Sequence, residues 1–235
     1  MIPLHDDIKT RRFPVVTYSL IAFNVLIYLY QIGLGVDLES FLFTYGLVPW
    51  NMTKGIASEG FSVKGHVLPW ISYMFLHGGV VHLLSNMWFL HVFGDNVEDR
   101  LGRVRFIVLY FCGGLIAALM QVMTGPSEMV PMVGASGAVS AILAAYALYY
   151  PRVRVLALVF IFLVPIPAFL FIGFWFVVQL FNGYTSLLWE SGTGVAWWAH
   201  IGGFAAGLVL AKALGFGCDD PCMKEMRTGL RVIGR

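Results

Sequence analysis

The sequence predicts an all-α integral membrane protein, a polytopic bundle of six transmembrane helices. Of its 235 residues, 59% are hydrophobic and only 12% are charged, whereas a soluble domain carries roughly 25% charged residues. The mean hydropathy is +0.79. Long apolar stretches recur along the whole chain, and no internal repeat or low-complexity linker divides it. We therefore expect a single membrane domain over residues 1–235, with a core at about 14–214, an N-terminal segment 1–13 and a tail 215–235.

Six stretches are long enough, or nearly so, to cross a bilayer. A spanning helix needs about 20 mainly apolar residues, because each residue rises ~1.5 Å and the hydrocarbon layer is ~30 Å thick. The first stretch is too long for the apolar region of a signal peptide, so we expect it to stay as an anchor. The predicted spans are Val15–Leu34, Ile71–Phe93, Phe106–Met123, Ser136–Tyr150, Val155–Phe181 and Val195–Leu214.

The basic residues give an independent check on this topology. A topology with six spans puts all but two of the 15 Lys and Arg residues on the same side of the membrane, in termini, loops or span ends; the exceptions are Lys54 and Lys64. Because Lys and Arg concentrate in cytoplasmic loops, we expect both termini to be cytoplasmic in a multi-pass protein of the cell (plasma or inner) membrane. The basic residues are scattered rather than gathered in a stripe, so we expect the lipid bilayer, and no nucleic acid, as a partner.

The fourth predicted span starts late. From Ser136 to Tyr150 the chain forms only roughly 22 Å of helix, so Ser136 should lie below the outer surface. The preceding segment, Pro131–Ala135, must then enter the membrane as irregular backbone. Such backbone is tolerated only where it is buried in protein or lines a water-filled cavity. The sequence thus predicts a recess that opens outward and has a serine at its floor.

Two polar residues in different spans could form a nucleophile and its base. Ser136 stands at a helix N-terminus in Gly134-Ala135-Ser136-Gly137, and His200 lies at a similar depth in the sixth span. Gly203 and Gly207 share a face with His200, and the fourth span carries small residues at a spacing of four. Small residues let helices approach closely, which would join hydroxyl and imidazole as an activated nucleophile. The alternative is that these small residues only pack helices together.

The second span contributes two more polar side chains at helical spacing. His82 and Asn86 are four residues apart and share one helix face. Both can donate hydrogen bonds to a developing negative charge, as an oxyanion hole requires; interhelical hydrogen bonding is the equally open alternative. His77, before the Gly78-Gly79 break, is expected to hold the adjacent loop.

Several catalytic classes lack their residues in this chain. Asp and Glu residues are expected in loops and termini, so no carboxylate is predicted to orient His200, and a serine mechanism would use a dyad rather than a triad. The His-Glu-x-x-His and Walker motifs are missing from the sequence. Cys218 and Cys222 form a Cys-x3-Cys pair, which is a weak metal motif. We expect neither a metal nor a cofactor.

Taken together, these residues resemble the rhomboid intramembrane serine proteases. The resemblance covers roughly residues 14–214 and includes Phe93–Gly102, which is similar to the family's loop after span two. Its principal motifs are His77-x4-His82-x3-Asn86, Gly134-Ala135-Ser136-Gly137 and Ala199-His200-x2-Gly203-x3-Gly207.

The resemblance implies a role for each of these residues. Ser136 would be the nucleophile and His200 the general base and acid. His82, Asn86 and the backbone N–H of Ser136 would form the oxyanion hole, with His77, Gly134, Gly137, Gly203 and Gly207 in support.

The chain departs from the family pattern at two places. Many relatives have a Trp-Arg pair in the first outer loop, where this chain has Trp70-Ile71. Many also place an aromatic residue one turn after the nucleophile, against the histidine; here that residue is Ser140. Support for the His200 ring would then have to come from Trp197, Trp198 or Phe204.

The function implied by the resemblance is serine proteolysis within the membrane. The family cleaves transmembrane helices of other proteins near their outer ends and uses no cofactor. The fifth span, with Pro165 and Pro167 and few small residues, is the side on which we expect a substrate helix to enter. Two alternatives are a catalytically impaired relative that binds transmembrane clients and a small-solute transporter with a polar path through the histidines.

Overall fold

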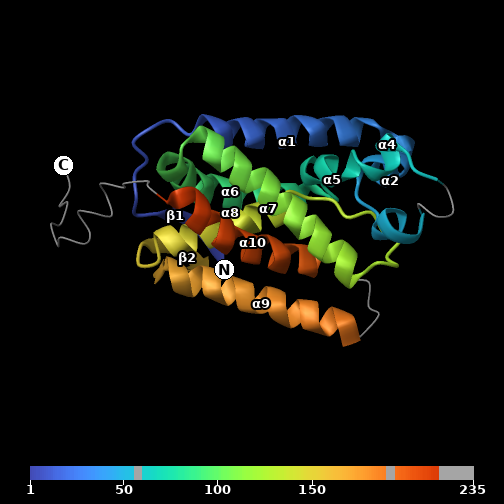
Figure 1. Cartoon of the computed structure of the whole chain (residues 1–235). Coiled ribbons are helices and arrows are strands. Elements are labelled where there is room, and N and C mark those ends of the chain that lie inside the picture. The colour runs from blue at the N-terminus through green and yellow to red at the C-terminus, as the bar shows by residue number, and fades with distance from the viewer. Residues whose placement is uncertain (56–59, 189–193, 217–235) are drawn as a thin grey trace.

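The computed structural model describes residues 1–55, 60–188 and 194–216 as a helical bundle with a small sheet at one end (Figure 1). The strands lie at this sheet end, and the short helices lie at the opposite loop end. The long helices are α1 (Val15–Gly33), α6 (Val80–Leu101), α7 (Arg103–Thr124), α8 (Ser136–Tyr149), α9 (Ala168–Leu188) and α10 (Trp197–Gly215). The short ones are η1 (Gly35–Asp37), α2 (Leu38–Tyr45), η2 (Asn51–Gly55), α4 (Val63–His66), α5 (Pro69–Ser72) and η3 (Tyr73–Phe75). The strands are β1 (Ile2–Asp6), β2 (Arg154–Val159) and β3 (Phe162–Pro167).

The helices have the length and composition of a multi-pass membrane protein. Helices α1, α7, α9 and α10 are each long and apolar enough to cross a bilayer. The segment Val63–Phe75 and α6 together supply a fifth candidate span, bent by 74°. Helix α8 is a shorter apolar helix within one residue of the predicted fourth span. The predicted helical membrane fold is confirmed, and the short sheet is an addition to it.

The predicted second span, Ile71–Phe93, is wrong at both ends. The chain bends between Phe75 and Val80, and α6 then continues to Leu101, through most of the segment expected to be a loop. The acidic residues of that segment are therefore helical, not in a loop. One of them, Glu98, accepts hydrogen bonds from the backbone N–H groups of Val16 (3.0 Å) and Thr17 (2.7 Å). This carboxylate satisfies donors that the first turn of α1 leaves free, so it fixes the start of α1 against α6.

The predicted fifth span, Val155–Phe181, is also wrong in its first half. Residues Arg154–Val159 and Phe162–Pro167 form an antiparallel hairpin, and β1 pairs with the other side of β2. The two-residue turn includes Phe160 at φ 55°, where Gly or Asn would have signalled a hairpin. Without that signal, an apolar run of helical length predicts a span. The two prolines lie in edge strand β3, where a missing N–H is tolerated.

The N-terminal strand is attached to the bundle through one carboxylate. The Tyr146 hydroxyl and the Asn96 side-chain amide both donate hydrogen bonds to Asp6, the latter at 2.8 Å. Burial raises the pKa of the Asp6 carboxyl above its ordinary value, although the hydrogen bond from Tyr146 opposes this shift. The sheet is thus fastened to α6 and α8 by an acid that is costly to keep ionised.

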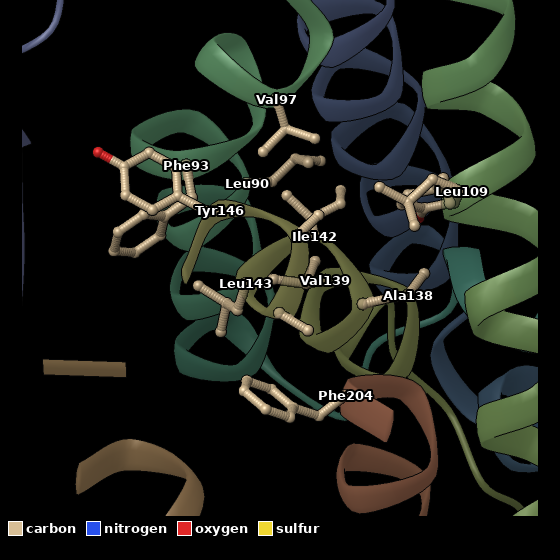
Figure 2. Close-up of a cluster of buried hydrophobic side chains, with 14 of the residues drawn as sticks. Leu90, Phe93, Val97, Leu109, Ala138, Val139, Ile142, Leu143, Tyr146 and Phe204 are labelled. Carbon is tan, nitrogen blue, oxygen red and sulfur yellow. The ribbon is translucent and has the colours of Figure 1, made fainter. Parts of the chain in front are cut away.

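Helix α8 is the centre of the bundle and is buried along most of its length. Figure 2 shows its side chains enclosed by residues of α6, α7 and α10. The labelled members are Leu90, Phe93 and Val97 of α6, Leu109 of α7, Ala138, Val139, Ile142, Leu143 and Tyr146 of α8, and Phe204 of α10.

Small residues bring α8 and α10 to backbone contact. A Cβ added at Gly203 would overlap the carbonyl group of Gly137, and one at Gly207 would overlap the backbone of Ala141. A Cβ at Gly113 of α7 would overlap the side chain of the same Ala141. Side chains at these positions would push the helices apart, so the predicted close contact between the fourth and sixth spans is confirmed.

We predict that Gly207→Ala destabilises the protein by about 1–3 kcal/mol, because the added methyl group overpacks the α8–α10 contact. Gly173→Ala is the matched control: a Cβ there meets nothing within 4 Å, and the change should be neutral or stabilise α9 by up to ~1 kcal/mol. Thermal unfolding in detergent micelles measures both. Equal midpoints for the two variants would contradict the packing account.

We also predict a pH-dependent effect of Asp6→Asn. Because the folded-state pKa of Asp6 is raised, the carboxyl favours folding most below about pH 4, and this contribution is lost as pH rises through the folded-state value. The difference in unfolding midpoint, wild type minus Asp6→Asn, should therefore become smaller as the pH is raised from acidic to neutral. A difference that grows with pH would show that the ionised form is the stabilising one.

Candidate active site

The two residues expected to react lie in contact. Ser136 is the first residue of α8, and His200 lies in the first turn of α10. The Oγ atom of Ser136 is 2.8 Å from Nε2 of His200. The glycine contacts between α8 and α10 begin one residue after Ser136 and continue along both helices, so the helix packing itself brings the hydroxyl to the imidazole.

The segment before Ser136 is irregular, as the late helix start predicted, and it is held from the loop end. Met132 exchanges both backbone hydrogen bonds with Leu47, and the Gly134 N–H donates to the Tyr73 carbonyl (2.9 Å). Gly134 has φ 128°, and a Cβ there would lie 2.7 Å from Nε2 of His82 and 3.5 Å from Oγ of Ser136. Only glycine leaves that space open between the two side chains.

A cavity of about 650 Å³ opens at the dyad and includes Ser136, His200, His82 and Asn86 in its lining. Much of the remaining wall is apolar, with contributions from Phe89 and Trp175 among others. A cavity of this size holds water and a short stretch of peptide. The structure therefore has a cavity whose lining includes Ser136. The outward direction of the recess stays a prediction.

His82 and Asn86 lie on the same face of α6 and can present donors to the cavity. The Gly78 N–H lies 3.4 Å from Nδ1 of His82, so a neutral His82 carries its proton on Nε2. The Nδ2 amide of Asn86 is buried and has no hydrogen-bond partner among the described residues. Unpaired buried donors are rare and costly in a folded protein. His82 and Asn86 line the same cavity as Ser136, as donors to an oxyanion would have to do.

Gln31 of α1 holds the backbone of His77. Its Oε1 accepts a hydrogen bond from the His77 N–H (3.0 Å), and its Nε2 donates one to the His77 carbonyl (3.0 Å). The His77 ring packs edge-on against His82, with centroids 5.2 Å apart. The chain bend before α6 is thus fixed by Gln31, which sequence reasoning had not singled out.

The His200 ring is held mainly by α9. Nδ1 of His200 is 2.8 Å from Oε1 of Gln179, and the Trp175 ring lies 6.1 Å from the imidazole. Of the three candidates proposed from sequence, Trp197 contacts the ring edge-on at 6.0 Å. Phe204 instead stacks on Phe176.

Sequence reasoning missed both α9 residues, although one signal was available. Gln179 is one of two amide side chains in a long apolar helix, and intramembrane polar residues need a partner. At the position where relatives carry an aromatic residue, the Ser140 hydroxyl donates to the Ser136 carbonyl (2.6 Å). It therefore bonds within α8 rather than packing on the histidine.

This arrangement has the parts needed for acyl transfer. A hydroxyl is in hydrogen-bond contact with an imidazole, and a cavity adjoins both. His82 and Asn86, whose side chains can donate to an oxyanion, line the same cavity. The cysteines Cys218 and Cys222 lie outside the described residues.

Comparison with known proteins points to one family. A model of the rhomboid domain matches residues 64–215, more than half of the chain. A Danio rerio protein named presenilin-associated rhomboid-like protein A, mitochondrial, is 32% identical over 93 residues, which cover 39% of this chain and 24% of the relative. A Bacillus subtilis protein, YdcA, named as a candidate rhomboid protease, is 29% identical over 136 residues, or 58% and 62% of the two chains. RHOMBOID-like protein 5 of Arabidopsis thaliana is 39% identical over 75 residues, or 32% and 24%.

These matches cover only part of each relative. The chain spans less than two thirds of the length of the three proteins, between 24% and 62%. The matched family domain contains α6, α8 and α10, which carry the dyad and the two cavity donors.

Proposed function

Because this chain belongs to the rhomboid family, we propose that it is an intramembrane serine endopeptidase that cleaves transmembrane segments of other membrane proteins. The single observation that carries this proposal is the 2.8 Å contact between Ser136 Oγ and His200 Nε2 in the lining of a cavity. In this proposal the mechanism uses a Ser-His pair and needs no metal or cofactor.

In the proposed first step, His200 Nε2 takes the Ser136 proton as the oxygen attacks the scissile carbonyl carbon. The resulting oxyanion faces His82 Nε2–H, Asn86 Nδ2–H and the backbone N–H of Ser136, which an α-helix leaves without an intrahelical acceptor. His200 then gives its proton to the leaving amine nitrogen, and the peptide bond breaks. The acyl-enzyme ester is hydrolysed by a water that His200 deprotonates in turn.

The substrate is proposed to approach from the bilayer along α9. This helix buries 28% of its most apolar window, against 50% for α7 and 44% for α10. Helix α1 is similarly exposed, but α9 alone of the two contacts the dyad, through Gln179 and Trp175. Small or helix-breaking residues in a substrate would ease its unwinding into the cavity. We further propose a cell-membrane location with both termini in the cytoplasm, on the strength of the basic-residue distribution.

A serine-directed fluorophosphonate and a membrane-embedded reporter with a fluorescent tag test this function. Wild type should be labelled and should cleave the reporter. Ser136→Ala and His200→Ala should lose both activities, because one lacks the nucleophile and the other the base. His82→Ala and Asn86→Ala should each lower the cleavage rate by about 10²–10³-fold through weaker oxyanion binding.

The matched control is His91→Ala, because His91 contacts Tyr18 and Trp88 rather than the dyad; its cleavage rate should equal that of wild type. Equal labelling of wild type, Ser136→Ala and His200→Ala would refute the assignment. Reporter binding without cleavage would favour a client-binding protein, and solute flux that survives Ser136→Ala would favour a transporter.

A further inference from the structure

Gln179 is the one polar side chain that α9 places against the proposed base. It is 5% exposed, within a helix whose neighbouring residues at 177, 178 and 180 are exposed apolar side chains. Its Oε1 atom is 2.8 Å from His200 Nδ1, the ring nitrogen that does not face Ser136. Burying an amide in an apolar helix costs free energy unless the amide is hydrogen-bonded. The contact with the imidazole supplies one such bond.

A second hydrogen bond fixes which way the amide points. The Nε2 group of Gln179 lies 3.1 Å from the Trp175 carbonyl oxygen. A carbonyl can only accept, so this end of the amide must be the NH₂ group, and the oxygen must face His200. Because that oxygen is also only an acceptor, His200 Nδ1 must carry the ring proton. Neutral His200 then presents the Nε2 lone pair to the Ser136 hydroxyl, as a general base requires.

We propose that Gln179 is the positioning residue of this protease and the third member of a hydrogen-bonded chain, Ser136–His200–Gln179. This proposal rests on the function proposed above. Gln179 holds the Nδ1–H tautomer and the ring orientation in the free enzyme. When Nε2 takes the Ser136 proton, the imidazolium keeps its Nδ1–H bond to the Gln179 oxygen until Nε2 releases its proton to the leaving amine. The amide exchanges no proton in this cycle.

An amide can serve in this place. In Ser-His-Asp enzymes the third group orients the imidazole and holds its tautomer, and papain-like proteases use an asparagine amide there. An amide has a particular advantage within a membrane, because a buried carboxylate is far more costly than a neutral group. The rings of Trp175 and Trp197 also pack near the imidazole, with centroids 6.1 Å and 6.0 Å from it.

The test separates hydrogen-bond acceptance from simple filling of space. Gln179→Met keeps the side-chain length but loses the amide oxygen. Gln179→Glu keeps an acceptor oxygen for Nδ1–H, and its acid form can still donate to the Trp175 carbonyl. Asn182→Leu is the control, because Asn182 is a second side-chain amide of α9. Among the described residues, this amide bonds only within its own helix, to the Val178 carbonyl (2.8 Å).

Reporter cleavage should show a fall in kcat of about 10-fold to 100-fold for Gln179→Met, with KM within about twofold of wild type. Gln179→Glu should keep kcat within about threefold of wild type, and Asn182→Leu should match wild type. Unfolding midpoints measured alongside should be similar for the two Gln179 variants. Loss of kcat that is equal in Met and Glu variants, or unchanged kcat in Gln179→Met, overturns the positioning role. A wild-type protein that cleaves nothing overturns the proposed function instead.

A spectroscopic measurement reads the tautomer directly. In ¹⁵N-histidine-labelled protein, a His200 resonance pair assigned by its loss in His200→Ala should show a protonated Nδ1 and an unprotonated Nε2 at neutral pH. Gln179→Met should redistribute the proton between the two nitrogens. A wild-type spectrum with the proton on Nε2 would overturn the proposal even if the variants lose activity.

Discussion

The approach of α8 to α10 is the contact on which the rest of this structure depends. Gly203 and Gly207 lie against the backbone of Gly137 and Ala141, so the two helix axes are close at the depth where Ser136 and His200 stand. These backbone contacts bring Ser136 Oγ within 2.8 Å of His200 Nε2. Helix packing thus sets the geometry of the reacting groups, whereas the loops contribute further lining residues to the cavity.

Several buried polar side chains of the bundle are paired through hydrogen bonds. At the loop end, Gln31 fixes the bend at His77 and Gln179 faces His200. At the sheet end, Glu98 caps the first turn of α1 and Asp6 joins the sheet to α8. A membrane interior makes each unpaired polar group costly. Against that background, the unpartnered amide of Asn86 is consistent with a donor kept free for a reacting carbonyl.

Much of this arrangement could be predicted from sequence because its signals are local. The small residues after Ser136 and His200 are at helical spacing, and the short fourth span forces Ser136 below the membrane surface. Those two patterns predict the dyad and its recess without any knowledge of loops. The pairing of His82 with Asn86 on one helix face is equally local.

The misses have two physical origins. Apolar composition does not distinguish a long helix from a hairpin followed by a helix, so residues 155–167 were read as part of a span, although they form strands. That error left the register of α9 undefined, and with it the contact of Gln179 with His200. The hydrogen bonds between Gln31 and His77 join residues 46 positions apart, a contact that no local pattern in a single sequence can reveal.

The central claim is that Ser136 Oγ is a nucleophile whose product oxyanion faces α6. An experimental structure of the protein after reaction with a phosphonate inhibitor tests it most directly. The account predicts phosphorus bonded to Ser136 Oγ, with the phosphoryl oxygen within hydrogen-bond distance of His82 and Asn86. Phosphorus bonded to another residue, or a phosphoryl oxygen directed away from α6 into the lipid, would contradict it.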